Sequence, residues 1–385
     1  MAAIRTERVY MILTMLAWLS IGNKQFTSNR INFAVAMMAF AILLSGVLNF
    51  GYTSPQDNEA MLNWFKLLPF YVLVMTAVKT ERDLKIIVTG FLVSFFLYLA
   101  HSYYEYMVGG RFVIAMDTKR MVGIDLTMNN PNAFGASIVC HVTLLLPFFI
   151  LVRKKWHYLF ILTYFLLSVR CIQLTGSRSS FMGLGLLMAS GGILSKHRMI
   201  FIPVICLAAV VVWFTLSDNL KERYLSIIDP TINASATLSA QGRSQGFWDG
   251  VENWKKSPIW GVGPENHGKA TGRGFLSHHL YAQVLGELGL IGTFAYVCLL
   301  VCFYLNHKEA YERYKLLERI GRVKEGKYCY NVSLMTVCGI LTLLYFGFGG
   351  HNAFRYNWVW FAAIQACAVS LLEEKTQWIV KLGKR

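Results

Sequence analysis

The chain has 385 residues, of which 55% are hydrophobic and 15% are charged, and its formal net charge is +16. Soluble domains carry about 25% charged residues, so this composition excludes an ordinary soluble globular protein. Several apolar runs reach the roughly 20 residues that a helix needs to cross a bilayer. We therefore expect an all-α fold, a polytopic transmembrane helix bundle of about 11 to 12 spans.

Hydropathy predicts the spans in chain order. They cover residues 9–22, 31–50, 60–78, 84–106, 131–152, 157–174, 180–195, 199–216, 280–305, 331–350 and 357–373. The first is short, so it stays open whether it crosses the membrane and on which side the N-terminus lies. The spans divide the chain into an N-terminal transmembrane bundle (1–216), a loop with an amphipathic helix (217–278), and C-terminal transmembrane helices with a cytoplasmic tail (279–385).

Lys and Arg in the short connections predict the orientation of the bundle. Basic clusters occur at 79–85, 153–155, 196–198, 308–327 and 381–385. On alternate connections these fall on one side, which the positive-inside rule makes cytoplasmic. Topology and contact with anionic lipid head groups explain much of the net charge, and no soluble basic domain is present that would bind nucleic acid.

Two motifs are predicted on the opposite side of the membrane. Asn130 and Asn132 flank a proline just before a span; they either start that helix or offer amide hydrogen bonds to a sugar or phosphate, and both interpretations stay open. Ser177 and Arg178 form a tight turn before a helix, a shape suited to holding an anion, although Arg178 could equally contact lipid head groups. Arg170 lies deeper in the preceding span, where an arginine indicates the interior of the bundle.

The loop 217–278 contains a predicted amphipathic helix over 243–256. Phe247, Val251 and Trp254 fall on one helical stripe, which is typical of a helix lying in the membrane interface as a lid. Arg243 at its start could bring a guanidinium over a lipid phosphate. A turn-rich return, 257–266, follows.

The stretch 277–292 begins the apolar helix predicted from Leu280 to about Leu305. Ser277 is a good N-cap residue, and His278 and His279 lie at the helix start. That start offers free backbone N–H groups to an anion and disfavours a charged imidazole, which leaves a neutral ring able to accept a proton. Glu287 lies about two turns further on, where we expect it to support packing or orient the site.

The side chains limit the chemistry. The exterior acids form no Asp-x-Asp pair, and the two histidines are adjacent, so we expect no metal site and no cofactor. No paired carboxylates present themselves for glycoside hydrolysis. Imidazole with several arginines at a membrane surface suits transfer from a lipid-linked diphosphate, because arginines bind the anion while a histidine removes a proton from the attacking hydroxyl.

Several motifs together carry a resemblance to a known family. They are His278, His279, Glu287, Gly289 and Gly292; Ser177-Arg178; Arg243, Trp248, Pro258, Gly261 and Gly263; and the Asn-Pro-Asn at 130–132. With them the sequence resembles the O-antigen ligase and polysaccharide polymerase superfamily. His279 is a departure, because the family usually has an amide or hydroxyl side chain there.

The resemblance implies a metal-independent, inverting glycosyltransferase of the bacterial inner membrane with its active site facing the periplasm. Its donor would be a glycan on undecaprenyl diphosphate, with His278 as general base and Arg178 and Arg243 on the diphosphate. The acceptor would be lipid A-core for a ligase, which we favour, or a second lipid-linked repeat for a polymerase. A non-enzymatic transporter of lipid-linked glycans would also explain the spans and the arginines.

Overall fold

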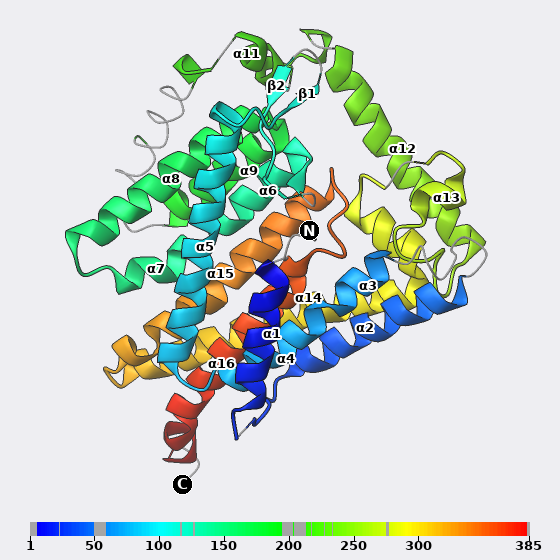
Figure 1. Ribbon diagram of the computed structural model, residues 1–385. Coiled ribbons are helices and arrows are strands. Elements are labelled where there is room, and N and C mark those ends of the chain that lie inside the picture. The colour runs from blue at the N-terminus through cyan, green and yellow to red at the C-terminus, as the bar shows by residue number, and fades with distance from the viewer. Residues whose placement is uncertain are drawn as a thin grey trace.

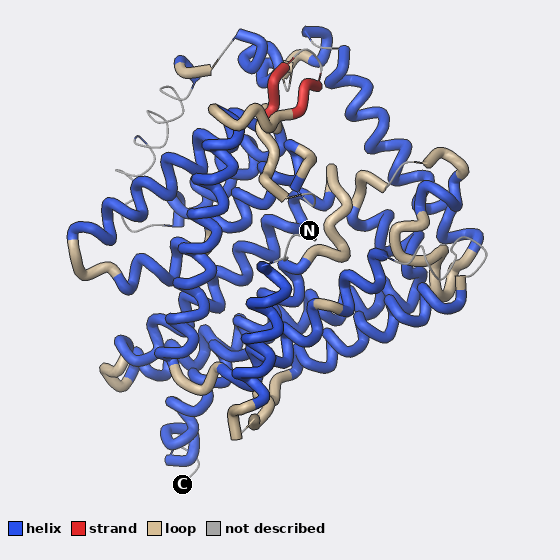
Figure 2. The backbone as a smooth tube through the Cα atoms, viewed as in Figure 1, coloured by secondary structure: helices blue, strands red, loops and turns tan. Residues whose placement is uncertain are grey.

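The computed structural model describes residues 6–22, 24–49, 59–115, 118–125, 128–194, 203, 213–216, 218–226, 228–232, 234–274 and 277–382. Figure 2 shows that these ranges form helices almost throughout, with one small two-stranded hairpin. The expected all-α polytopic bundle is therefore confirmed.

Seven helical segments in the described ranges are long and apolar enough to cross a membrane. They are α2 (Arg30–Leu48), α3 with α4 (Glu59–Phe65 and Leu67–Ala77), α5 (Glu81–Met107), α6 with α7 (Pro131–Val142 and Leu145–Leu151), α8 (Lys155–Thr175), α14 (Leu280–Arg319) and α15 (Val323–Gly347). Each corresponds to one of the expected spans.

The other four expected spans differ. The first is α1 (Thr6–Leu19), which has 14 residues and is about 21 Å long, shorter than the hydrocarbon core of a bilayer. The span at 180–195 is α9 (Arg178–Leu194), which has 17 residues. The span at 357–373 lies within α16 (Tyr356–Leu382), whose first half is buried in the bundle. The span at 199–216 and the basic cluster at 196–198 lie largely outside the described residues.

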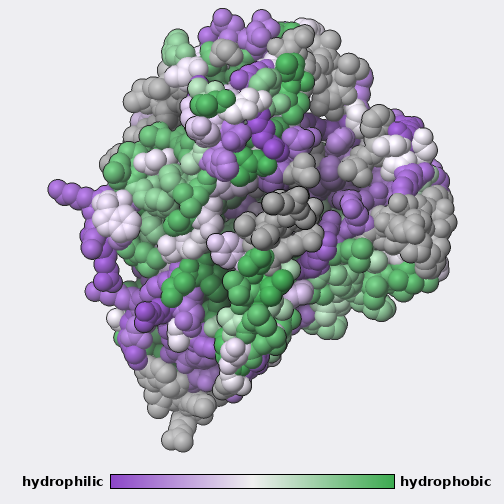
Figure 3. Space-filling model, in the orientation of Figure 1, coloured by the Kyte–Doolittle hydropathy of each residue, from purple (hydrophilic) through white to green (hydrophobic). Residues whose placement is uncertain are grey.

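The remaining elements gather on one side of the bundle. They are the antiparallel strands β1 (Val113–Ala115) and β2 (Thr118–Arg120), α11 (Asp218–Leu225), the 3-10 turn η2 (Pro230–Ile232), α12 (Ala234–Lys256) and α13 (His267–Thr271). In Figure 1 they lie at the top and right, whereas the basic connections α4–α5, α7–α8 and α14–α15 lie at the left and bottom. Figure 3 shows hydrophilic residues in both regions and hydrophobic areas between them.

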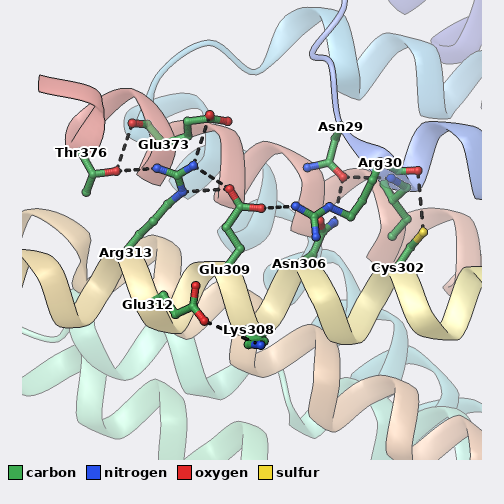
Figure 4. Close-up of polar contacts among 11 residues, drawn as sticks. Asn29, Arg30, Cys302, Asn306, Lys308, Glu309, Glu312, Arg313, Glu373 and Thr376 are labelled. Atoms are coloured by element: carbon green, nitrogen blue, oxygen red, sulfur yellow. Dashed lines mark hydrogen bonds and ion pairs between the residues drawn. The ribbon is translucent and has the colours of Figure 1, made fainter. Parts of the chain in front are cut away.

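Helix α14 is longer than expected. It continues past residue 305 to Arg319, so the first part of the basic stretch 308–327 is helical. Figure 4 shows how its charges are matched: Arg313 Nη2 lies 2.6 Å from Glu309 Oε1 and 3.2 Å from Glu373 Oε1. Arg30 Nη2 lies 2.5 Å from the other Glu309 oxygen. This network joins α2, α14 and α16 at the basic side of the bundle.

Helix α12 packs on the start of α14 through small residues. A Cβ placed on Gly250 would lie 2.6 Å from the Cβ of Ala282, so the two backbones approach as closely as in small-residue membrane interfaces. The packed face holds Gly246, Gly250 and Asn253. The expected apolar stripe of α12, formed by Phe247, Val251 and Trp254, is only half-buried at the edge of this contact. The glycine face packs against α14 instead, because glycine has no side chain that would hold the two helices apart.

Helix α14 is broken at Gly289, where φ is 63° and ψ is −160°. The turn-rich return inserts there. Leu290 N donates to Pro258 O (2.9 Å) and Ile291 N to Ile259 O (3.1 Å), while the carbonyls of Gly286 and Glu287 accept from Val262 N (2.9 Å) and Gly263 N (3.0 Å). Four bonds to the loop thus replace two bonds of the helix ladder, and no backbone group at the break loses its partner.

Gly261 makes this insertion possible. Its φ is +74°, and a Cβ there would lie 2.3 Å from the Glu287 carbonyl. Asn49 on α2 donates to the Gly261 carbonyl, and Ser45 Oγ donates to the Glu287 carbonyl at 2.6 Å. The loop, α14 and α2 are therefore fixed to one another at a single point.

We predict that Gly261→Ala destabilises the protein by about 2 kcal/mol or more, because backbone strain and a steric clash add together. Gly272→Ala is the matched control: its φ is +71° but nothing lies within 4 Å of the added Cβ. Thermal unfolding of both variants in detergent tests this. Equal losses in the two variants would show that the loop adapts and that close approach is unimportant.

Candidate functional site

A cavity of about 430 Å³ lies near the start of α6, the start of α14 and the end of α15. Three segments form it: the start of α6, the residues before α14, and the connection between α15 and α16. Its lining includes Asn130, Asn132, His278, His351, Asn352, Arg355 and Asn357. Three of the side chains expected at the site thus meet in one place, although they are far apart in sequence.

His278 is exposed at the mouth of this cavity. Partial burial and the nearby Arg243 guanidinium lower the pKa of its imidazole below the ordinary value. Its ring lies 5.6 Å from the His351 ring, centroid to centroid. A ring that stays neutral at neutral pH and borders a cavity can accept a proton from a bound hydroxyl.

His279 has a different environment. It is the N-cap residue of α14, without a side-chain cap bond, and it is absent from the cavity lining. Its ring packs against Phe247 (5.0 Å), Tyr281 (5.4 Å) and Phe348 (6.0 Å). Ser277, expected as the cap, is buried, and its hydroxyl donates to the His279 carbonyl at 3.2 Å. The structure thus separates the two adjacent imidazoles into one that borders the cavity and one packed among aromatic rings.

Arg243 on α12 lies outside the cavity lining, next to Gly349, which is part of that lining. Its Nε lies 3.2 Å from where a Cβ on Gly349 would be, so the absence of a side chain there makes room for the guanidinium. Burial lowers its pKa, and the Tyr345 ring lies nearby. Among the described residues, Arg243 forms no ion pair within 4 Å. Its charge is thus available to an anion that enters from the cavity.

Arg178 and Ser177 lie at the start of α9, outside the cavity lining. Arg178 Nη1 donates to Ser226 Oγ at 3.0 Å, which connects α9 to the end of α11. Ser177 is buried, and its hydroxyl accepts from Ser180 N at 3.4 Å, as a helix-starting serine does. The neighbouring Ser179 does line the cavity. The anion-binding role of Arg178 stays a prediction.

Asn130 starts α6, as one interpretation of the sequence expected, and amide hydrogen bonds from Asn130 and Asn132 to a sugar or phosphate stay a prediction. Asn130 is the N-cap of α6: its side-chain oxygen accepts from the backbone N–H of Asn132 (2.9 Å) and Ala133 (3.3 Å). Arg120 Nη2 donates to Asn132 Oδ1 at 2.8 Å. Both side chains nevertheless line the cavity, so helix-start chemistry places two carboxamides at its wall.

Arg170 is half-buried in α8 and lies outside the cavity lining. Its Nη1 donates to Gln173 Oε1 at 3.4 Å, and Gln173 donates in turn to Thr215 at 3.1 Å. These contacts connect Arg170 to Gln173, one turn further along α8, and through Gln173 to Thr215.

Glu287 is fully buried in α14. One carboxylate oxygen accepts from Glu265 N (2.9 Å) and Gln283 Nε2 (3.3 Å), and Gln283 Oε1 accepts from Ala353 N (3.3 Å). This chain of contacts runs from the return loop through α14 to the segment that carries His351 and Arg355. Glu287 can therefore orient the cavity wall from outside the cavity.

Hydropathy leaves residues 351–356 as a short connection between the expected spans 331–350 and 357–373. The structure places His351, Asn352 and Arg355 from this connection, and Asn357 at the start of α16, in the cavity lining. Burial and the neighbouring His278 and Arg355 lower the pKa of His351 to about 4, so its ring is neutral at neutral pH. The available signal was the polar cluster itself, between two apolar runs.

The charges of the cavity favour an anion. Among the lining residues Arg355 carries positive charge and no side chain is a carboxylate, while the Arg243 guanidinium lies beside the lining residue Gly349. The imidazoles of His278 and His351 have lowered pKa values and are neutral at neutral pH, so the net charge around the cavity is positive. Within the described ranges, no three His, Cys, Asp or Glu side chains lie close enough together to hold a metal ion.

Residues 163–297 match the family model described as O-Antigen ligase, a segment that includes Arg178, Arg243, His278 and Glu287. A search of curated proteins found no match. The matched segment contains both the cavity histidine and the return loop that breaks α14, and the match supports the O-antigen ligase superfamily.

Proposed function

We propose that this chain transfers a glycan from undecaprenyl diphosphate to a sugar hydroxyl on the periplasmic face of the bacterial inner membrane. The family supports a membrane glycosyltransferase of the ligase and polymerase type. Joining O-antigen to lipid A-core is the form of the reaction that we favour, and extension of a lipid-linked repeat is the alternative. The observation that carries the proposal is His278 at the mouth of a cationic cavity.

In the proposed reaction, neutral His278 removes the proton from the acceptor hydroxyl as its oxygen attacks the anomeric carbon of the donor. The bond between that carbon and the diphosphate oxygen breaks, so undecaprenyl diphosphate leaves with the electron pair. Because attack and departure occur on opposite faces of the sugar, the anomeric configuration is inverted. The proton held by the imidazole is then released to water.

The leaving diphosphate gains negative charge during the transfer, and cations placed beside it lower the barrier. Arg243 supports this role because it lies beside Gly349 of the cavity wall and has no ion-pair partner among the described residues. We assign Arg178 to the same diphosphate, on the approach formed by α9 and α11, where its side chain lies beside Ser226. No metal or cofactor takes part in this proposal.

His278→Gln is expected to reduce the transfer rate by about 100-fold or more, because a general base contributes that much. His279→Gln is the control, since its ring packs among aromatic side chains and not in the cavity. Transfer from undecaprenyl-diphosphate-linked glycan by the purified variants in nanodiscs is the measurement. Retention of most of the transfer rate by His278→Gln would refute His278 as the general base, whereas a wild-type protein that transfers no glycan would favour a transporter over an enzyme.

Arg243→Gln is expected to lower kcat/KM by about 100-fold and also to change the pH dependence. Arg243 helps to keep the pKa of His278 below its ordinary value, so removing this cation raises that pKa. The loss of activity on acidification should therefore begin at a higher pH than in the wild type. Arg178→Gln should lower kcat/KM without this shift, because Arg178 is not among the groups that perturb His278. Identical pH profiles in the wild type and Arg243→Gln would contradict the assigned geometry.

The choice between ligase and polymerase is tested by the acceptor. Supplied with lipid-linked repeat alone, the purified wild-type protein should leave the repeat unextended, and product should form only when lipid A-core is added. Gel electrophoresis of the labelled glycan reports both outcomes. Chain growth in the absence of lipid A-core would identify a polymerase and refute the ligase assignment.

A further inference from the structure

The proposed reaction uses only part of the cavity. His278 is part of its lining, and Arg243 lies just outside that lining beside Gly349. The connection between α15 and α16 forms another wall with His351, Asn352, Arg355 and, at the start of α16, Asn357. No role has yet been given to these four residues. The inference below rests on the proposed function and concerns what this second wall binds.

Arg355 is a half-buried guanidinium that lacks a counter-ion. Its Nη1 lies 3.2 Å from the sulfur of Met128, and among the described residues no carboxylate lies within 4 Å of it. The nearest acid, Asp125, accepts from the Tyr98 hydroxyl and from Met128 N, and acts on Arg355 only at longer range. A buried charge without a partner is costly. An anion in the cavity would remove that cost.

Two carboxamides beside Arg355 also have unused hydrogen-bonding atoms. Asn352 is 8% exposed and Asn357 is 3% exposed, and both line the cavity. Asn352 Nδ2 donates to Leu343 O at 2.8 Å, which fixes the amide and leaves its Oδ1 unpaired within the described structure. Asn357 Nδ2 is likewise unpaired there. One acceptor and one donor on two residues that line the cavity thus lack a partner among the described residues, and a sugar hydroxyl that reached them would satisfy each one.

The two imidazoles lie next to each other, with the ring centroids of His278 and His351 5.6 Å apart. Arg355 lines the cavity together with His351, and Arg243 lies beside the lining residue Gly349 and is a charged neighbour of His278. This arrangement provides two places for negative charge, one at each guanidinium.

An inverting transfer needs two such places. The nucleophile and the leaving group lie on opposite faces of the anomeric carbon, and the base must contact the nucleophile. If the diphosphate lies at Arg243, the acceptor hydroxyl at His278 extends toward His351 and Arg355. We propose that Arg355, Asn352 and Asn357 form the acceptor subsite, and that it binds a sugar carrying an anionic oxygen group.

The anionic group can be the carboxylate of an acidic sugar or a phosphate on a sugar, because an arginine fork binds either one. Neutral sugars would lack this contact. The probes that distinguish these sources are glucuronate, glucose 6-phosphate and glucose, with undecaprenyl diphosphate as the probe for the leaving-group side.

The test compares Arg355→Gln with Arg243→Gln in the full-length protein in nanodiscs. Arg355→Gln should weaken binding of the anionic sugar by about 10-fold or more, while the Kd for undecaprenyl diphosphate changes by less than about twofold. Arg243→Gln should show the reverse. Arg153→Gln, an exposed arginine at the basic side, is the matched control and should change neither. Whichever of glucuronate and glucose 6-phosphate binds more tightly to the wild type identifies the anionic group.

Two results would overturn the proposal: loss of undecaprenyl diphosphate binding in Arg355→Gln as large as in Arg243→Gln, or wild-type binding of both anionic sugars no tighter than that of glucose. Should Arg355→Gln fail to fold, Asn357→Ala keeps the charge and should still weaken sugar binding selectively. Because these are binding measurements, their outcome is independent of the His278 transfer assay. A negative result in the sugar-binding measurements can therefore be distinguished from a negative result in the His278 transfer assay.

Discussion

The structure depends on the exchange of backbone hydrogen bonds at Gly289. A spanning helix cannot break inside a bilayer unless its freed N–H and C=O groups find other partners. The return loop supplies them through the backbone of 258–263, and the glycine at 261 permits an approach that any side chain would block. Glu287, Gly289 and Gly292 of α14 and Pro258, Gly261 and Gly263 of the return loop thus form one backbone junction.

This junction between α14 and the return loop positions the segments around the cavity. Glu287, next to the break, connects the backbone of Glu265 to Gln283, and Gln283 holds the backbone of Ala353. On the other face of α14, the glycine face of α12 packs against Ala282 and brings Arg243 toward Gly349. The segments that line the cavity are therefore all held relative to the first three turns of α14.

The charges follow from this arrangement. Acids and bases on the basic side of the bundle neutralise one another, as in the network of Arg313, Glu309 and Glu373. Around the cavity, the imidazoles are kept neutral by burial and by nearby cations, and Arg243 and Arg355 lack ion pairs among the described residues. A wall with unpaired guanidiniums and a neutral base is suited to anionic substrates that react by proton removal.

The sequence by itself predicted the class of fold, the basic side of the bundle and the resemblance to the O-antigen ligase superfamily, because hydropathy, basic residues and motif spacing are local properties of the chain. It also identified Asn130, Asn132 and His278, which share one cavity. Only the tertiary structure decided that His278, and not His279, borders that cavity, that Arg178 extends toward Ser226, and that α12 packs through its glycines. It also added Arg355 and Asn357. Adjacent residues at a helix start point in different directions, and which of them reaches the cavity depends on packing between segments that lie far apart in the sequence.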